Sequence, residues 1–293
     1  DTSDEWIRER TGMTERHVIT SEKLEDLAAE AALKAIENAG ITPTDIDYII
    51  CSNVVNEYIT PGLSCIIQGA IGAKCACVDV NAACSGFIYA LDMADDRIKS
   101  GKAKTILVVA AEEPTRMVDW KDRSICVLFG DGAGAAVVTE GDALIGSRLT
   151  TVSKTECLHY VRTLEPTPYI TKEEESKPMY MNGREVFKTA VLSSSRDIRT
   201  LLDAAGLQPE EIKYYILHQA NMRIIEAICG QLKLDMSHFP TNVAHYGNTS
   251  SASVAILLDE LNRDGKLQKG DKLLLSAFGA GFTTGACIIE WTK

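Results

Sequence analysis

Residues 78–89 constrain the fold most, because strand-like alternation changes there to helical spacing within a few residues. Apolar residues alternate with Asp79 on the way in, small residues fill the middle, and helically spaced apolar residues follow from Phe87. This pattern predicts a strand, a tight turn and a helix, with Cys84 at the turn. A cysteine at a helix N-terminus meets unpaired backbone N–H groups and the positive end of the helix dipole, so we expect a nucleophile with a lowered thiol pKa. A small cysteine that packs the helix against a sheet is the alternative.

The composition of the chain excludes several classes of protein. No apolar run approaches the ~20 residues that cross a bilayer, and no signal-like segment opens the chain, so we expect a cytoplasmic protein with no membrane partner. The formal net charge of −11 argues against nucleic acid as a general partner. Nine cysteines without paired spacings favour reduced thiols over a disulfide framework. No His follows Cys75 and Cys77 at ligand spacing, so we expect no metal.

Helical and strand-like patterns alternate along the chain, which is typical of an α/β fold. Helical patterns are expected within 1–12, at 22–39, 63–71, 184–205, 222–232 and 250–262, and from Cys84 to Gly101-Lys102. Strands are expected at 48–52, 104–111, 213–217, 272–278 and 286–291. We expect the first long helix to be capped by Ser21. A hairpin is predicted from 125–129 to 134–139 through Gly130-Asp131-Gly132. The pattern weakens over 141–178, so this segment is interpreted as a connection between two halves.

A faint internal repeat supports two similar halves. Cys84 begins a helix that ends near Gly101, and a buried strand follows. Asn248 begins a helix that ends before Gly265, and another buried strand follows. Two copies of a β-α-β-α-β unit explain the length and the alternation.

Three further polar or glycine-rich positions follow predicted strands. His218 lies at the carboxyl end of a strand, where open α/β sheets bind ligands, although a lone His is more often structural. Asn248 is equally well explained as a helix N-cap. The turn around Ala280 could place a backbone N–H against a ligand, or form a bulge. Together with Cys84 they form a candidate nucleophile with hydrogen-bond donors for an oxyanion.

These motifs resemble those of the bacterial β-ketoacyl-acyl carrier protein synthase III family of thiolase-like condensing enzymes. The matching stretches occur in the same order along the whole chain, at 1–7, 10–12, 82–87, 129–135, 181–187, 218–221, 247–253 and 278–285. The resemblance implies thiolase-like duplicated βαβαβ halves, 1–143 with the nucleophile and 144–293 with His and Asn, in a layered αβαβα arrangement. It also implies a homodimer.

The resemblance implies a decarboxylating condensation that initiates fatty acid biosynthesis. Cys84 would take the acyl group of an acyl-CoA primer, acetyl-CoA or similar, with the oxyanion held by the backbone N–H groups of Cys84 and Ala280. Malonyl-acyl carrier protein would then lose CO₂ while His218 and Asn248 donate to its thioester carbonyl. The enolate would attack the acyl group to give 3-ketoacyl-acyl carrier protein. No cofactor is implied, because acyl-CoA is a substrate.

The resemblance also assigns binding residues. Trp6 and Arg123 would sandwich the CoA adenine, which suits an indole and a guanidinium with flat faces. The remaining assignments are Thr2 and Arg10 for the nucleotide, Gly183 and Asn221 for the pantetheine channel, and Arg184, Lys188 and Arg223 for acyl carrier protein.

The chain departs from the family pattern in two places. The resemblance implies a further N-terminal strand, which the family normally has and which is absent from this sequence. Thr60 precedes Pro61 where straight-chain members have a bulky aromatic residue, which predicts a roomier acyl site.

Three other functions remain open on the sequence alone. A thiolase-like acyltransferase or ketosynthase of secondary metabolism would use the same three residues on a different acceptor. A cysteine hydrolase also has Cys, His and Asn in this order, but the Cys-Gly-Ser-Cys-Trp environment and a matching element order are missing. A non-catalytic CoA-binding protein would form no acyl-enzyme.

Overall fold

Two four-stranded sheets form the framework of the computed structural model, which describes residues 2–162, 167–169 and 177–293. The first sheet has the order β2-β1-β3-β4 and the second the order β5-β10-β9-β8. The strands are β1 (Tyr48–Ser52), β2 (Ala76–Val80), β3 (Thr105–Glu112), β4 (Gly132–Thr139), β5 (Leu144–Thr151), β8 (Tyr214–Leu217), β9 (Lys272–Gly279) and β10 (Thr283–Glu290). A small third sheet pairs β6 (Leu158–His159) with β7 (Tyr180–Met181).

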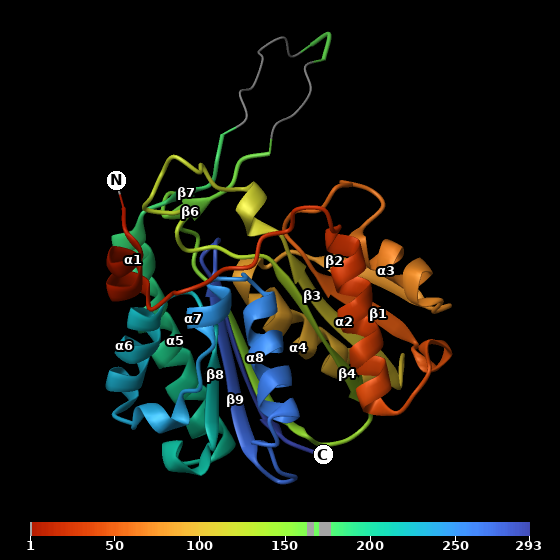
Figure 1. Cartoon of the computed structure of the whole chain (residues 1–293). Helices are drawn as coiled ribbons and strands as arrows, with labels where there is room; N and C mark the ends of the chain where they lie inside the picture. Colours follow the sequence, from red (N-terminus) through yellow and green to blue (C-terminus); the bar gives the residue numbers. More distant parts are fainter. Residues whose placement is uncertain (1, 163–166, 170–176) are drawn as a thin grey trace.

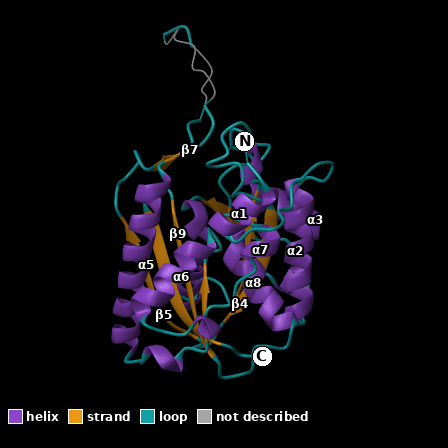
Figure 2. Ribbon diagram, turned by 60° about the vertical axis from the view of Figure 1, so that its left-hand side comes forward, coloured by secondary structure: helices purple, strands orange, loops and turns teal. Residues whose placement is uncertain are grey.

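The helices form three layers around and between the two sheets (Figure 1). They are α1 (Asp4–Thr11), α2 (Leu24–Ala39), α3 (Leu63–Ile71), α4 (Gly86–Lys99), α5 (Gly183–Ala205), α6 (Met222–Leu232), α7 (Val243–Tyr246) and α8 (Ala252–Arg263). Apolar residues of α4 and α8 share one buried core with both sheets. The outer face of the first sheet is covered by α2 and α3, and that of the second by α5 and α6 (Figure 2). This is the predicted αβαβα arrangement.

Three strands of each sheet, β1-β3-β4 and β8-β9-β10, share one topology, which confirms the predicted duplication. In the first sheet β1 is parallel to β2 and β3, and β4 is antiparallel to β3. In the second sheet β8 is parallel to β9, and β10 is antiparallel to β9. The chain passes from one sheet to the other between Thr139 and Leu144.

The predicted hairpin at 125–139 is wrong. Residues 125–128 form turns, and β4 pairs with β3 instead. Ile125 and Phe129 are apolar because they join a small buried cluster with Met117, Val118 and Met179. A strand and a packed turn give the same short apolar run, so the sequence pattern could not separate them.

The interpretation of 141–178 as a connection is also wrong in part, because β5 occupies residues 144–151 and pairs with β10. Most of its side chains are half-buried on both faces. An edge strand of this kind lacks the continuous apolar run of a central strand, which explains the weak signal. A smaller error concerns α2, which begins at Leu24 with Lys23 rather than Ser21 at its N-cap position.

Of the helices in the described part of the chain, none combines the length and the apolar character that a membrane span requires.

Candidate active site

One cavity of about 1180 Å³ collects residues from both halves of the molecule. It is lined by the turn before α4, the residues after β8 and β9, the loop before α8, the helix α1 and the β6–β7 pair. Cys84, His218, Asn248 and Ala280 all line it. Residues more than 190 positions apart in the sequence, such as Cys84 and Ala280, therefore meet at one site.

Cys84 lies in a single 3₁₀ turn, Ala83–Ser85, between β2 and α4. Ala83 has φ +47°, a left-handed conformation that non-glycine residues adopt only where the surroundings impose it. The Gly-rich turn after β9 presses on this backbone, since a Cβ on Gly279 would lie 2.6 Å from Cys84 N. Only glycine fits this close approach.

Thr283 joins the turn that contains Cys84 to the glycine-rich turn after β9 by hydrogen bonds. No pattern in the sequence pointed to this residue. The Ser85 hydroxyl donates to Thr283 Oγ1 at 2.8 Å, and Thr283 Oγ1 donates to Ala82 O at 3.0 Å. The nucleophile turn of the first half is thereby fixed against the glycine-rich turn of the second.

The expected low thiol pKa of Cys84 is wrong. Burial is the largest cause and raises the pKa of the Cys84 thiol to about 12. The Ser250 hydroxyl, 3.3 Å from Sγ, favours the thiolate, whereas the Glu112 carboxylate disfavours it. Desolvation therefore outweighs the hydrogen bonds that favour the thiolate, and the thiol form is favoured at neutral pH. Attack by Cys84 needs a group that takes up this proton.

His218 follows β8 directly and is 2% exposed. Its Nδ1 lies 2.7 Å from the Ser253 hydroxyl, which also accepts the Gln219 N–H. If the hydroxyl proton of Ser253 is donated to Nδ1, the ring proton sits on Nε2. Burial lowers the pKa of His218 to about 3, so the imidazole is neutral at physiological pH. His218 is therefore arranged to donate a hydrogen bond from a neutral ring.

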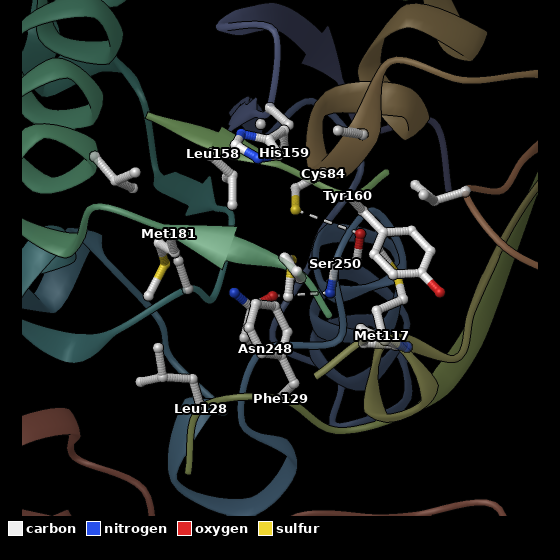
Figure 3. A pocket seen from close by; sticks show the side chains of 18 of the residues that line it. Cys84, Met117, Leu128, Phe129, Leu158, His159, Tyr160, Met181, Asn248 and Ser250 are labelled. Carbon is white, nitrogen blue, oxygen red and sulfur yellow. Dashed lines mark hydrogen bonds between the residues drawn. The ribbon is translucent and has the colours of Figure 1, made fainter. Parts of the chain in front are cut away.

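Asn248 lies in the loop between α7 and α8 and is 6% exposed. Its Oδ1 accepts the Ser250 N–H at 2.9 Å, which leaves the Nδ2 amino group to donate (Figure 3). The backbone N–H of Asn248 donates to Leu128 O, and its carbonyl accepts from Gly130. The helix α8 begins only at Ala252, so Asn248 is not its N-cap.

Apolar side chains surround the nucleophile on the inner side of the cavity. Leu158 and Met181 come from the β6–β7 pair, and Met117, Leu128 and Phe129 come from the turns that precede β4 (Figure 3). These residues lie in short or irregular segments without periodicity, so no spacing along the chain predicts that they meet around Cys84. Thr60 does not line this cavity, whereas its neighbours Tyr58 and Ile59 do.

The predicted CoA-binding residues divide into two groups. Trp6, Arg10, Arg123, Gly183 and Asn221 line the outer part of the cavity, but Thr2, although described, does not. The guanidinium carbons of Arg123 and Arg10 lie 5.0 and 5.6 Å from the Trp6 ring centroid. Two guanidinium groups thus lie over the indole ring of Trp6.

Of the three residues predicted to meet acyl carrier protein, only Arg223 lines the cavity. It also donates to Glu9 O, and its backbone N–H is capped by Asn221 Oδ1. Arg184 and Lys188 are exposed on α5 outside the cavity.

Comparison with known proteins supports one family throughout the chain. The family model described as 3-oxoacyl-[acyl-carrier-protein] synthase III matches residues 78–154, and the model of the C-terminal region of that enzyme matches residues 202–291. The β-ketoacyl-[acyl-carrier-protein] synthase III of Clostridium acetobutylicum is 44% identical over 301 residues, which cover 100% of this chain and 92% of the relative. The same enzyme from Aquifex aeolicus is 43% identical, covering 99% and 92%.

Solved structures agree with this assignment. The synthase III of Aquifex aeolicus superimposes with a TM-score of 0.91 at 42% identity, over 99% of this chain and 92% of that chain. The priming β-ketosynthase of the R1128 polyketide pathway superimposes with a TM-score of 0.92 at 34% identity, over 100% and 89%. With the motif order, the duplicated fold and the shared cavity, these comparisons show that the chain belongs to the 3-oxoacyl-[acyl-carrier-protein] synthase III family.

Proposed function

We propose that this acyltransferase joins an acyl-CoA primer to malonyl-acyl carrier protein with loss of CO₂, giving 3-ketoacyl-acyl carrier protein and initiating fatty acid synthesis. The observation that carries the proposal is the meeting of Cys84, His218 and Asn248 in one cavity. The full-length identity of 44% to a curated synthase III supports it. No cofactor is required, because acyl-CoA is consumed as a substrate.

In the first step Cys84 Sγ attacks the thioester carbon, and the CoA thiol leaves. The backbone N–H groups of Cys84 and Ala280 are the proposed donors to the tetrahedral oxyanion. Support comes from the close contact of Gly279 with Cys84 N, which places the two backbone segments side by side. The apolar side chains of Leu158, Met181 and Phe129 offer a dry site for the acyl chain.

In the second step His218 Nε2–H and Asn248 Nδ2 donate to the thioester carbonyl of the malonyl group. Two neutral donors stabilise the enolate as CO₂ leaves, and neither has to lose a proton. The enolate carbon then attacks the acyl group on Cys84. We infer a division of labour in which residues 1–143 supply the nucleophile and residues 144–293 supply the two donors.

For the CoA nucleotide we propose stacking of the adenine on Trp6. Arg123 now lies over that ring at 5.0 Å, so the adenine has to separate or replace this contact. The other proposed contacts are Arg10 and Thr2 at the nucleotide, Gly183 and Asn221 along the pantetheine, and Arg184, Lys188 and Arg223 at the acyl carrier protein. We also propose a homodimer in the cytoplasm, a compartment that suits nine free cysteines.

The decisive experiment is mass spectrometry of the protein after incubation with acetyl-CoA. We expect one acetyl group on the peptide that contains Cys84, and none on the Cys84→Ala variant. Addition of malonyl-acyl carrier protein should then release CO₂ and remove the acetyl group from the enzyme. Absence of the adduct in the wild-type protein would contradict the proposal.

A second candidate is the priming condensation of a polyketide pathway, because the R1128 priming ketosynthase shares the fold at 34% identity. The chemistry is the same, and the acceptor protein differs. Parallel assays with malonyl groups on a fatty acid carrier protein and on a polyketide carrier protein distinguish the two. A preference for the polyketide carrier would favour the second candidate.

A further inference from the structure

A buried carboxyl group lies next to the nucleophile, and the mechanism above does not use it. Glu112 is the last residue of β3 and is 2% exposed. Its Oε2 accepts the Val54 N–H at 3.1 Å, and its Oε1 accepts the hydroxyl groups of Ser250 and Ser251. The ion pairs formed within the described residues do not include Glu112. Burying a carboxyl group without a cation costs folding free energy, so a buried carboxyl at this position calls for a role.

Ser250 connects this carboxyl group to the nucleophile. Its Oγ lies 3.3 Å from Cys84 Sγ, a contact marked in Figure 3. The same Oγ lies 3.2 Å from Glu112 Oε1. A hydroxyl has one proton, so Ser250 donates to only one of these atoms at a time. When it donates to Glu112, its lone pairs are free to accept the thiol proton of Cys84. The three groups then form a continuous path from the thiol to the carboxylate.

The backbone at Ser250 holds this bridging position at a conformational cost. Ser250 has φ +53°, and the Asn248 side chain accepts its N–H at 2.9 Å. A non-glycine residue stays in this region only where neighbouring contacts impose it. Ser251 is fixed in turn by hydrogen bonds with Glu112 and Ser52.

The surroundings of Glu112 raise the pKa of its carboxyl group. Burial raises the pKa of the Glu112 carboxyl to about 7, against the lowering effect of the hydrogen bonds from Ser251, Val54 and Ser250. The titratable groups that face it are Cys84 from the turn before α4 and Cys51 from β1. From the segment before α8, the hydroxyl groups of Ser250 and Ser251 contact the Glu112 carboxyl. On the neighbouring strand β4, Gly132 pairs with Glu112.

We propose that Glu112 accepts the thiol proton of Cys84 through Ser250 during acylation, a step that rests on the proposed function above. As the bond from sulfur to the thioester carbon forms, the S–H bond breaks and its proton moves to Ser250 Oγ. The hydroxyl proton of Ser250 moves at the same time to Glu112 Oε1. When the C–S bond to CoA breaks, the departing CoA sulfur takes the proton back, so no proton or electron is gained or lost overall. Ser250 touches the reacting atom, and Glu112 is a positioning residue that acts through it.

The test compares the pH dependence of two reactions of Cys84 in the wild type, Glu112→Gln and Ser250→Ala. The first reaction is single-turnover acetylation by acetyl-CoA, and the second is alkylation by iodoacetamide. Because other cysteines also react with iodoacetamide, alkylation is followed on the Cys84 peptide by mass spectrometry. The wild-type rates should rise with pH and level off above an inflection near 7, where Glu112 becomes ionised. In both variants the inflection should disappear, and acetylation at pH 8 should fall by about 10²-fold, within the usual range of general-base catalysis.

Glu113→Gln is the matched control, because Glu113 neighbours Glu112 in sequence but faces Arg116 at 3.6 Å and does not bond Ser250. It should keep the wild-type inflection and rate. A purely structural role for Glu112 would lower the rate equally at all pH values and preserve the inflection, which would overturn the proposal. If Glu112→Gln lowers the unfolding temperature strongly, Ser250→Ala decides alone, since it keeps the carboxyl and breaks the path. Alkylation needs no acyl-CoA, so failure of the relay is distinguishable from failure of the proposed function.

Discussion

The two halves of the molecule use the same backbone device for different chemistry. Each has a non-glycine residue with positive φ just before its central helix, Ala83 at +47° before α4 and Ser250 at +53° before α8. The first device presents a thiol, and the second presents an amide and a hydroxyl beside His218. The duplicated halves thus each place a turn before their central helix against one cavity, after β2 in the first half and after α7 in the second. The side chains on these turns make one a candidate nucleophile site and the other a candidate donor site.

A side-chain network secures the edge of the second sheet. There β5 pairs along the outer side of β10, and Asp197 of α5 accepts hydrogen bonds from Thr150 of β5 and Thr284 of β10. These contacts tie the two strands together and fix α5 against them.

Cys84→Ala should have the largest effect and should separate the chemical roles of the two halves. Acetyl transfer to the enzyme should fall by roughly 10⁴-fold or more, because the nucleophile is removed. Release of CO₂ from malonyl-acyl carrier protein should persist, because His218 and Asn248 are untouched. Radiolabelled acetyl and carboxyl groups measure the two reactions. Loss of both activities, in a variant that still folds, would mean that the halves do not work independently.

The reciprocal change, His218→Ala, should spare acylation of Cys84 and slow decarboxylation. The enolate loses one donor, which costs about 10²- to 10³-fold in rate. Because burial lowers the pKa of His218 to about 3, the rate of decarboxylation should show no inflection from this ring between pH 5 and 8. Asn248→Ala should slow decarboxylation similarly, and it should also slow acylation because the Ser250 N–H loses its acceptor. A deficit confined to acylation would reverse the assignment of roles.

Gly279→Ala tests the contact between the halves. The added Cβ would lie 2.6 Å from Cys84 N, so the turns must separate, at a cost of about 1–3 kcal/mol in the free energy of unfolding. Acylation should fall by about tenfold or more. Gly230→Ala is the control, since nothing lies within 4 Å of its Cβ position in α6, and it should stabilise by about 0.5–1 kcal/mol. Equal behaviour of the two variants in urea unfolding would refute the close approach.

Asp197→Asn probes the network that secures β5 in the second half. Burial alone would raise the pKa of Asp197, but hydrogen bonds from Thr284, Thr150 and the two arginines Arg196 and Arg148 outweigh it and lower the pKa. A carboxyl with a lowered pKa stabilises the fold above its unfolded pKa of ~3.9 and loses this effect as pH falls through the folded pKa.

We therefore expect Asp197→Asn to lower the free energy of unfolding by about 1–3 kcal/mol at pH 7, and by less below about pH 4. Asp259→Asn is the control, because its pair with Arg263 is exposed on both sides and should contribute about 0.5 kcal/mol or less. Urea unfolding at several pH values measures both. A deficit that is constant with pH would show that ionisation of Asp197 is unimportant.

The smallest effect is expected at the proposed CoA site. Trp6→Ala should raise KM for acyl-CoA by about 3- to 30-fold with little change in kcat, because stacking contributes uniformly to binding. Trp120→Ala is a matched control, since Trp120 is 58% exposed and does not line this cavity. A larger KM effect at Trp120 than at Trp6 would place the nucleotide elsewhere.

The sequence predicted best where one local pattern decides the structure. The helices α3 and α6 begin and end where apolar spacing and terminal residues place them. Cys84 and His218 follow strands as expected, whereas Asn248 follows the short helix α7 and was singled out by its motif. The prediction was wrong at 125–129, where a short apolar run fits both a strand and a packed turn. It was also wrong at 144–151, where an edge strand lacks a regular alternation of apolar and polar residues. Pairing of β6 with β7 places Leu158 and Met181 in the same cavity as Cys84. No residue spacing in the sequence predicts this arrangement.

The amino-acid sequence by itself indicated two similar halves, because the alternation of helical and strand-like patterns is a local property of the chain. The layered arrangement and the roles of Cys84, His218 and Asn248 were implied by the resemblance of the motifs to a known family. Only the tertiary structure decided the ionisation of the site. The pKa of Cys84 is raised rather than lowered, and that of Glu112 lies near 7, because desolvation depends on everything that packs around a group. Glu112, Ser250 and Cys84 come from three distant segments, so their hydrogen-bonded path exists only once the two halves have closed on each other.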